Sequence, residues 1–481
     1  MTASPARRRQ ATRIGAVLLG ASLVAVVAVS VLAVATLRAS REGRAPATDS
    51  RPVAVYPETP NAALAVVDDL DRLTSLVVAT LDPSGVGGSL VVVPVNVDAA
   101  DGVGVERRPL SQRPFAPGDE AQLAELLAQL EPLISTTIER GVVLGPAELA
   151  DLLRPIAPLD VDLPEDVVDA DAPGSGVVAP AGPSSLGADE LVAALTAISP
   201  DGTSYSHHDV DVALWSAVAA AAPVGGGSPV PSDDAGRPLA PGSVDELLDR
   251  LLAGSIGARP LAVSQPADVE NETDADFTIV DRVDALIVFA SISPGLVSAP
   301  SDALSFRLVL GYGPDQLPTS DGEGPAVTKE LLARIVVSEL VFAGANVIAV
   351  DLADAPDDVP DVTRIEVVRD ETADAIAGLV DQLYPGADVS VADLLVDRTD
   401  VTIVLGRDVL EARGDVLRQQ VREAASATAS TEPGTTDVAV ETGDGASTAT
   451  SGDVAETAPD GSTAGTSASS GSGGGTVDAD G

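Results

Sequence analysis

The hydrophobic pattern of the chain begins with one long apolar run. Residues 14–37 form 24 consecutive positions without a charge, and four arginines lie in the thirteen residues before them. A helix of this length, at 1.5 Å per residue, is about 36 Å long and can cross a hydrocarbon layer of about 30 Å. Because arginines favour the cytoplasmic side, we expect residues 1–13 in the cytoplasm and the bulk outside. The pattern predicts a single-pass, extracytoplasmic protein of the cell membrane.

A cleaved signal peptide is the alternative interpretation of this run. Ala33 and Ala35 resemble the small residues of a cleavage site. The apolar core of a signal peptide is typically about 7–15 residues long, which is shorter than the run found here. The length therefore favours an uncleaved anchor, and both interpretations export the rest of the chain.

Shorter apolar patterns predict an α/β domain over residues 61–300, after a stalk at 38–60 without periodicity. Aliphatic runs at 76–81 and 89–93 predict strands that are buried on both faces. A further strand is expected at 284–291, and residues 64–73 are expected to be a helix or an irregular approach to the first strand. Apolar residues at helical spacing predict helices at 119–130, 146–153, 185–198 (with Ser185 as the N-cap), 209–222 and 244–252.

The pattern starts again at residue 303. Four strands and two helices follow in βαββαβ order, at 305–310, 328–342, 346–351, 364–368, 372–383 and 401–405. This order predicts a small split-βαβ domain of the ferredoxin-like type over residues 303–412. After Arg422 the chain has no Lys or Arg and is rich in Ser, Thr, Gly and acids. Such a composition buries too little apolar surface to offset the entropy of ordering, so residues 424–481 are expected to be a disordered tail.

Composition excludes several classes of function. The 481 residues include 73 acidic and 28 basic side chains, for a formal net charge of −45, and only 2% are aromatic. A negative field repels nucleic acid, and few aromatic rings are available to stack on bases, so no nucleic-acid partner is expected. The chain has no cysteine, which excludes disulfides, thiolate metal sites and cysteine nucleophiles.

Two clusters could be mistaken for metal sites. His207 and His208 precede Asp209 and Asp211. Adjacent histidines point apart on a helix, so we interpret this cluster as a solvated helix start with acids in its first turn.

The second cluster is Asp68, Asp69 and Asp71, which could supply oxygen ligands to Mg²⁺. In a chain with 73 carboxylates such clusters are expected by chance. No metal ligands and no cofactor are predicted.

The expected strands carry a family resemblance. Arg72-Leu-Thr-Ser75 leads into a strand that ends in Asp82-Pro83, and the next strand ends at Pro94. With the Ser185-Leu-Gly-Ala-Asp-Glu190 segment, this order resembles the LytR-CpsA-Psr (LCP) family. Residues 303–412 resemble the LytR C-terminal domain, notably at Phe342-Ala-Gly-Ala-Asn-Val347 and Asp400-Val-Thr-Ile-Val-Leu-Gly406. The resemblance covers about residues 61–410.

The resemblance implies an α-β-α sandwich that holds a polyprenyl-phosphate lipid and, with Mg²⁺, transfers a glycopolymer to peptidoglycan. The family's site has an Asp before the first strand and an Arg-Asp pair after the proline, which fall on Thr74, Val95 and Asn96 here. Its later arginines fall within residues 195–215, where no arginine occurs. Without arginine, the bidentate bonds that recognise a diphosphate are lost, and each is worth about 1.5–3 kcal/mol.

Three hypotheses follow. The first is a catalytically inactive LCP-like envelope protein, a binding or assembly module in cell-wall biogenesis whose partner is the lipid or a cell-wall polymer. The second is an active phosphotransferase that uses substitute residues, with Asp71 or Asp98 for Mg²⁺ and Arg72 for phosphate. The third is an acidic structural or adhesive surface protein with a modified Ser/Thr tail.

Overall fold

The computed structural model describes ten stretches of the chain: residues 50–98, 109–112, 114–170, 176–198, 204–222, 230–233, 236–264, 278–299, 303–318 and 327–431. The predicted membrane helix at 14–37 and the tail beyond residue 431 lie outside these stretches. Within them, no helix is both long enough and apolar enough to span a bilayer.

A five-stranded mixed sheet forms the centre of the N-terminal half. It consists of β2 (Asn61–Val67), β3 (Leu73–Leu81), β4 (Gly88–Val93), β5 (Gly141–Leu144) and β10 (Ile256–Pro260). The spatial order is β10-β4-β3-β2-β5, with β3 antiparallel to both of its neighbours and the two outer pairs parallel. Every residue of β2 and β3 is buried, and for β3 this confirms the prediction from its aliphatic run.

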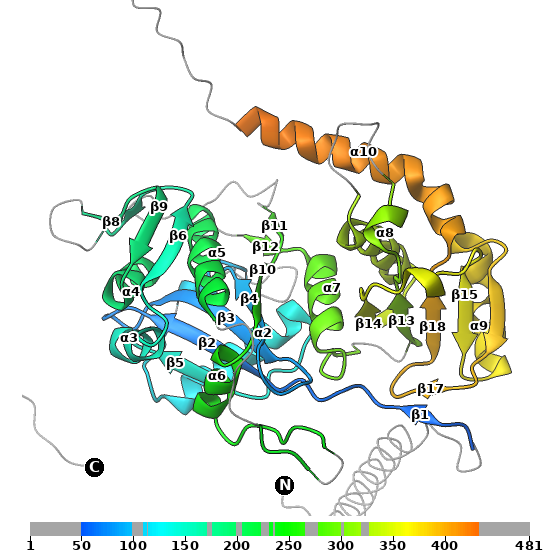
Figure 1. Ribbon diagram of the computed structural model, residues 1–481, viewed down its shortest axis with the longest axis horizontal. Coiled ribbons are helices and arrows are strands. Elements are labelled where there is room, and N and C mark those ends of the chain that lie inside the picture. The colour runs from blue at the N-terminus through cyan, green and yellow to red at the C-terminus, as the bar shows by residue number, and fades with distance from the viewer. Residues whose placement is uncertain are drawn as a thin grey trace, which may run out of the picture. The chain divides into compact units, whose positions relative to one another are not determined.

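Helices cover both faces of this sheet (Figure 1). Alternate residues of β2 point to opposite faces, so Ala63 and Ala65 join one apolar cluster while Ala62 and Leu64 join another. The first cluster includes α2 (Glu120–Ile134) and α7 (Arg282–Ile292). The second includes α3 (Pro146–Leu153), α4 (Ala188–Thr196), α5 (Ser204–Ala221) and α6 (Val244–Leu252). The fold class is α/β, as predicted.

Short elements complete this half. Three two-stranded sheets are antiparallel pairs: β6 (Leu159–Leu163) with β9 (Gly182–Leu186), β7 (Val167–Val168) with β8 (Val177–Ala179), and β11 (Val263–Ser264) with β12 (Ile279–Val280). A 3₁₀ turn, η1, spans Leu110–Gln112.

A second sheet forms the C-terminal half. Its strands are β13 (Ser305–Val309), β14 (Asn346–Asp351), β15 (Arg364–Val367), β16 (Asp388–Val391) and β18 (Val401–Val404), in the order β14-β13-β18-β15-β16. The helices are α8 (Lys329–Phe342), α9 (Asp370–Leu383) and α10 (Arg407–Thr431), with 3₁₀ turns η2 (Pro314–Gln316) and η3 (Pro356–Asp358).

The ferredoxin-like prediction for this half is wrong in its topology. A split βαβ places a third strand between the two strands that a helix joins. Here the strands joined by α8, β13 and β14, are direct parallel neighbours, and so are β15 and β16, joined by α9. The last strand, β18, separates the two pairs. Element order alone does not determine which strands pair, and β16 escaped prediction because all four of its residues are exposed.

Residues 284–291, predicted to be a strand, belong to the helix α7. Asp281 caps this helix, since its carboxylate accepts hydrogen bonds from Val283 N at 2.9 Å and Asp284 N at 3.2 Å. Residues 285–290 of α7 are all apolar, so no helical stripe was visible in the sequence. A short continuous apolar run does not distinguish a buried strand from a buried helix.

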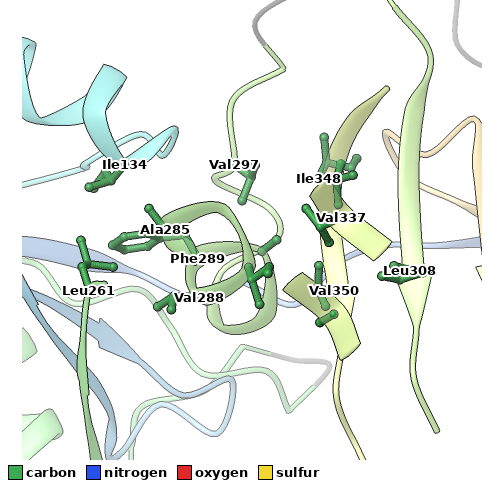
Figure 2. Close-up of a cluster of buried hydrophobic side chains, with 14 of the residues drawn as sticks. Ile134, Leu261, Ala285, Val288, Phe289, Val297, Leu308, Val337, Ile348 and Val350 are labelled. Atoms are coloured by element: carbon green, nitrogen blue, oxygen red, sulfur yellow. The ribbon is translucent and has the colours of Figure 1, made fainter. Parts of the chain in front are cut away.

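Helix α7 lies between the two halves and packs on both (Figure 2). It contacts α2 on one side and β14 and α8 on the other. Phe289 is fully buried, and one continuous apolar cluster includes Ile134 of α2 and Ile348 and Val350 of β14. The two sheets are therefore held by a shared hydrophobic core.

Three local predictions are also corrected. Residues 64–73, predicted to be a helix or an approach to the first strand, contain most of the strand β2, whose alternation was hidden because both of its faces are buried. Ser185 lies in β9, and Gly187 caps α4, where Gly187 N donates to Glu190 Oε2 at 2.7 Å. Residues 424–431, assigned to the disordered tail, continue α10.

The end of the predicted stalk pairs with the C-terminal half. Strand β1 (Val53–Ala54) runs parallel to β17 (Leu395–Val396). The Arg51 guanidinium donates to the carbonyl oxygens of Ala392 at 2.6 Å and Val368 at 2.7 Å. The chain thus contacts the second half before it enters the first sheet.

Candidate functional site

The family-equivalent positions Thr74, Val95 and Asn96 lie at one end of the central sheet. Strand β3 begins there and β4 ends there, because the two strands are antiparallel. The three residues are 2%, 6% and 1% exposed. The Thr74 hydroxyl donates to the carbonyl oxygen of Val66 at 3.3 Å, and Asn96 Oδ1 accepts from the Thr278 hydroxyl at 2.8 Å. The fold brings these positions together, but it turns them into the protein interior.

Arg72, proposed as a substitute phosphate ligand, is part of a closed turn with Asp68. The Asp68 carboxylate accepts from Leu70 N at 2.9 Å, from Arg72 N at 2.8 Å and from Arg72 Nε at 2.6 Å. The turn also holds Asp71 in the left-handed region, at φ 60°. Asp68 therefore acts as a structural residue of this turn, and its guanidinium partner is already engaged.

The other two substitute candidates, Asp71 and Asp98, are half-buried and border the same segment. The Asp71 carbonyl oxygen accepts from Phe115 N at 2.7 Å, and the backbone of Asp98 forms an isolated antiparallel β-bridge with Pro109. Across the described stretches, no group of three or more His, Cys, Asp or Glu side chains is arranged to hold a metal ion.

A buried polar cluster lies on the other side of β3, against α5. Trp215 Nε1 donates to Ser75 Oγ at 3.0 Å, and the Ser75 hydroxyl bonds the carboxyl group of Asp211. His208 lies one turn before Asp211 on the same helix, and all four residues are buried. Trp215 thus occupies the space between α5 and the sheet.

Burial shifts the pKa values of both titratable members of this cluster. Loss of hydration raises the pKa of Asp211 well above its ordinary value, and the hydrogen bond from Ser75 opposes the shift only in part. Loss of hydration lowers the pKa of His208, against Asp209 and the backbone of Leu261, which raise it. Both shifts favour the uncharged forms, and they suit a cluster enclosed by apolar side chains.

The prediction of a solvated helix start at His208 and Asp211 is therefore wrong. Helix α5 begins at Ser204, so both residues lie within it and face the sheet, while Asp209 is exposed. The single tryptophan, one turn after Asp211, was the available signal that this face is buried.

A cavity of about 540 Å³ opens at the opposite end of the central sheet. Its walls come from the end of β3, the start of β4, β10, the end of α7, and the strands β13 and β14, with Tyr56 from the segment after β1. Arg259 and Arg307 line it together with Asp82 and Asp351. No sequence pattern indicated this site, because its residues come from seven separate segments of the chain.

Comparisons with known proteins give structural similarity only. No family model matches the chain, and no curated protein matches it. Among solved structures, B. subtilis TagV is 14% identical, with 48% of this chain and 94% of that chain covered and a TM-score of 0.33. Protein gbs0355 from Streptococcus agalactiae is 13% identical, with 52% and 91% covered and a TM-score of 0.34. TagT bound to LI-WTA is 14% identical, with 50% and 94% covered and a TM-score of 0.32. Identities and TM-scores at this level do not indicate a function.

Proposed function

We propose that this chain is a membrane-anchored, extracytoplasmic, LCP-like protein of the cell envelope that binds or assembles cell-wall components without catalysing transfer. The proposal combines the sequence resemblance, the predicted anchor at residues 14–37 and the chemistry of the family-equivalent positions. Its partner would be a cell-wall polymer or its polyprenyl-phosphate carrier.

The main support for this proposal is the chemistry and burial of the side chains of Thr74, Val95 and Asn96. A transferase site needs a carboxylate for the metal and guanidinium groups for the diphosphate. These positions supply one hydroxyl, one isopropyl group and one amide, all buried, and the hydroxyl and the amide oxygen are bonded inside the protein. None of the three is a carboxylate or a guanidinium, so these positions supply neither the metal ligand nor the diphosphate contacts that transfer needs.

The substitute residues give little support to an active enzyme. Arg72 is bonded to Asp68, so transfer of its guanidinium to a phosphate would leave the Asp68 carboxylate without that ion pair. This engagement counts against Arg72 as a phosphate ligand and so against the active-enzyme alternative.

A transfer assay tests the catalytic part of the proposal. The full-length chain in detergent is incubated with Mg²⁺, a lipid-linked glycopolymer and peptidoglycan, beside an active LCP enzyme as the positive control. We expect polymer attachment by the control and none by this chain. Attachment by the wild-type chain that the variants Asp71→Asn, Arg72→Gln or Asp98→Asn abolish would refute the inactive assignment in favour of the substitute residues.

Localisation tests the rest of the proposal. In cells that express the full chain, we expect it in the membrane fraction and degraded by protease added to intact protoplasts. Recovery in the soluble cytoplasmic fraction would contradict both the anchor and the envelope role.

A further inference from the structure

The cavity at the far end of the central sheet has the size and lining of a small-molecule site. Its volume of about 540 Å³ lies within the range of about 300–1,000 Å³ that is common for ligand pockets. It lies at the opposite end of β3 and β4 from Thr74 and Asn96, since Thr80, Leu81 and Gly88 line it. It is therefore distinct from the family-equivalent positions.

Arg259 is the main feature of this cavity. It lies on β10, is half-buried, and makes no ion pair or hydrogen bond with any residue in the described part of the chain. A half-buried guanidinium without a partner is unfavourable, and it stands here in a chain with 73 acidic side chains. Its planar group suits bidentate binding of a phosphate or a carboxylate.

Arg307 lines the cavity from the second sheet and is in a different state. Its Nη2 pairs with Asp351 Oδ2 at 3.1 Å, so its charge is compensated. Asp82 also lines the cavity, and its Oδ1 accepts from Ser84 N at 2.8 Å. Among the two arginines of the lining, Arg259 is therefore the one left to bind an anionic group, while the carboxylates of Asp82 and Asp351 can accept hydrogen bonds from neutral donors.

Polar groups in the lining suit a hydroxylated ligand. Ser89 is half-buried and lines the cavity together with the carboxylates of Asp82 and Asp351, and these groups can bond the hydroxyl groups of a ligand. Thr59 and Thr80 also border the cavity, but their Oγ1 atoms are enclosed by protein and lie out of a ligand's reach.

We propose that this cavity binds a polyhydroxylated organic anion of sugar size, with its phosphate or carboxylate on Arg259 and its hydroxyl groups on Ser89, Asp82 and Asp351. The inference deepens the proposed function, because it names a ligand class for the binding role. The cavity lies between the two sheets, so both halves of the chain contribute residues to its walls.

Calorimetric titration of the full-length chain in detergent tests the proposal with four probes: glucose 1-phosphate, glucuronate, glucose and inorganic phosphate. We expect binding of one or both sugar anions, and at least about tenfold weaker binding of glucose and of inorganic phosphate. The preferred anion distinguishes a phosphate ligand from a carboxylate ligand. The proposal is overturned if neither sugar anion binds, or if inorganic phosphate binds as tightly as the sugar anions.

Matched variants locate the site. Arg259→Gln should weaken the sugar anion by about tenfold or more, whereas Arg364→Gln, which removes an exposed arginine of β15, should leave affinity unchanged. Ser89→Ala removes one hydroxyl of the lining and should weaken binding severalfold with the fold retained. Equal effects of Arg259→Gln and Arg364→Gln would overturn the assignment. Transfer activity, measured separately, tests the proposed function without affecting this result.

Discussion

Trp215 Nε1 lies 3.0 Å from Ser75 Oγ and donates a hydrogen bond to it across the interface between α5 and β3. Both residues are almost completely buried, and the serine hydroxyl continues the chain of bonds to the carboxyl group of Asp211. A polar group in an apolar interface is costly unless it is bonded, so this bond offsets the cost of burying the indole N–H and the serine hydroxyl.

A double-mutant cycle should detect this bond. Trp215→Phe and Ser75→Ala should each lower the free energy of unfolding by about 1–3 kcal/mol, because each removes volume or leaves a buried partner unbonded. The coupling energy should be about 0.5–1.5 kcal/mol, measured by urea denaturation of the two single variants and the double variant. Strict additivity would show that the bond contributes nothing.

Asp211 should make stability depend on pH. Its pKa is raised in the folded state, so the protonated form is favoured there, and stability falls as pH rises from the unfolded value of about 3.9 through the folded value. Asp211→Asn removes this penalty and should raise the melting temperature at neutral pH. The gain should shrink as pH falls towards about 4.

Asp209→Asn is the matched control for this prediction. Asp209 is the exposed acid two positions earlier on α5, so its substitution should change the melting temperature far less at neutral pH. A lower melting temperature for Asp211→Asn at neutral pH, with the control unchanged, would mean that the charged carboxylate stabilises the fold.

Phe289→Ala should destabilise both halves of the chain together. Phe289 is fully buried on α7, in the core that the two sheets share, and truncation of such a side chain costs about 3–5 kcal/mol. We expect one cooperative thermal transition at a lower temperature. Phe342→Ala is the control: its ring is 93% exposed, so the change should stay within about 0.5 kcal/mol. Two separated transitions in Phe289→Ala would show that the halves unfold independently.

Asp68→Ala should loosen the turn before β3. The substitution removes the acceptor of Leu70 N, Arg72 N and Arg72 Nε, and we expect a loss of about 1–3 kcal/mol by chemical denaturation. Asp69→Ala, at the exposed neighbouring position, should be nearly neutral. Equal stability of the two variants would contradict a structural role for Asp68.

Local pattern determined much of the secondary structure. The aliphatic runs at 76–81 and 89–93 are strands, and the helical spacing at 146–153 and 244–252 gives α3 and α6, because these periodicities follow from one face or two faces being buried. Where the central residues of a helix are all apolar, as in α7, or both faces of a strand are buried, as in β2, the sequence has no polar face to reveal the period. The prediction failed at those two elements for this reason.

The sequence by itself also determined the charge, the lack of cysteine and the residue types at Thr74, Val95 and Asn96, since these are properties of composition and order. Only the tertiary structure decided that those three positions are buried, that Trp215 reaches Ser75, and that β13 pairs with β14. It alone brought Arg259, Arg307, Thr59 and Thr80 to one cavity. These contacts join residues far apart in the chain, and no local pattern encodes which distant segments pack together.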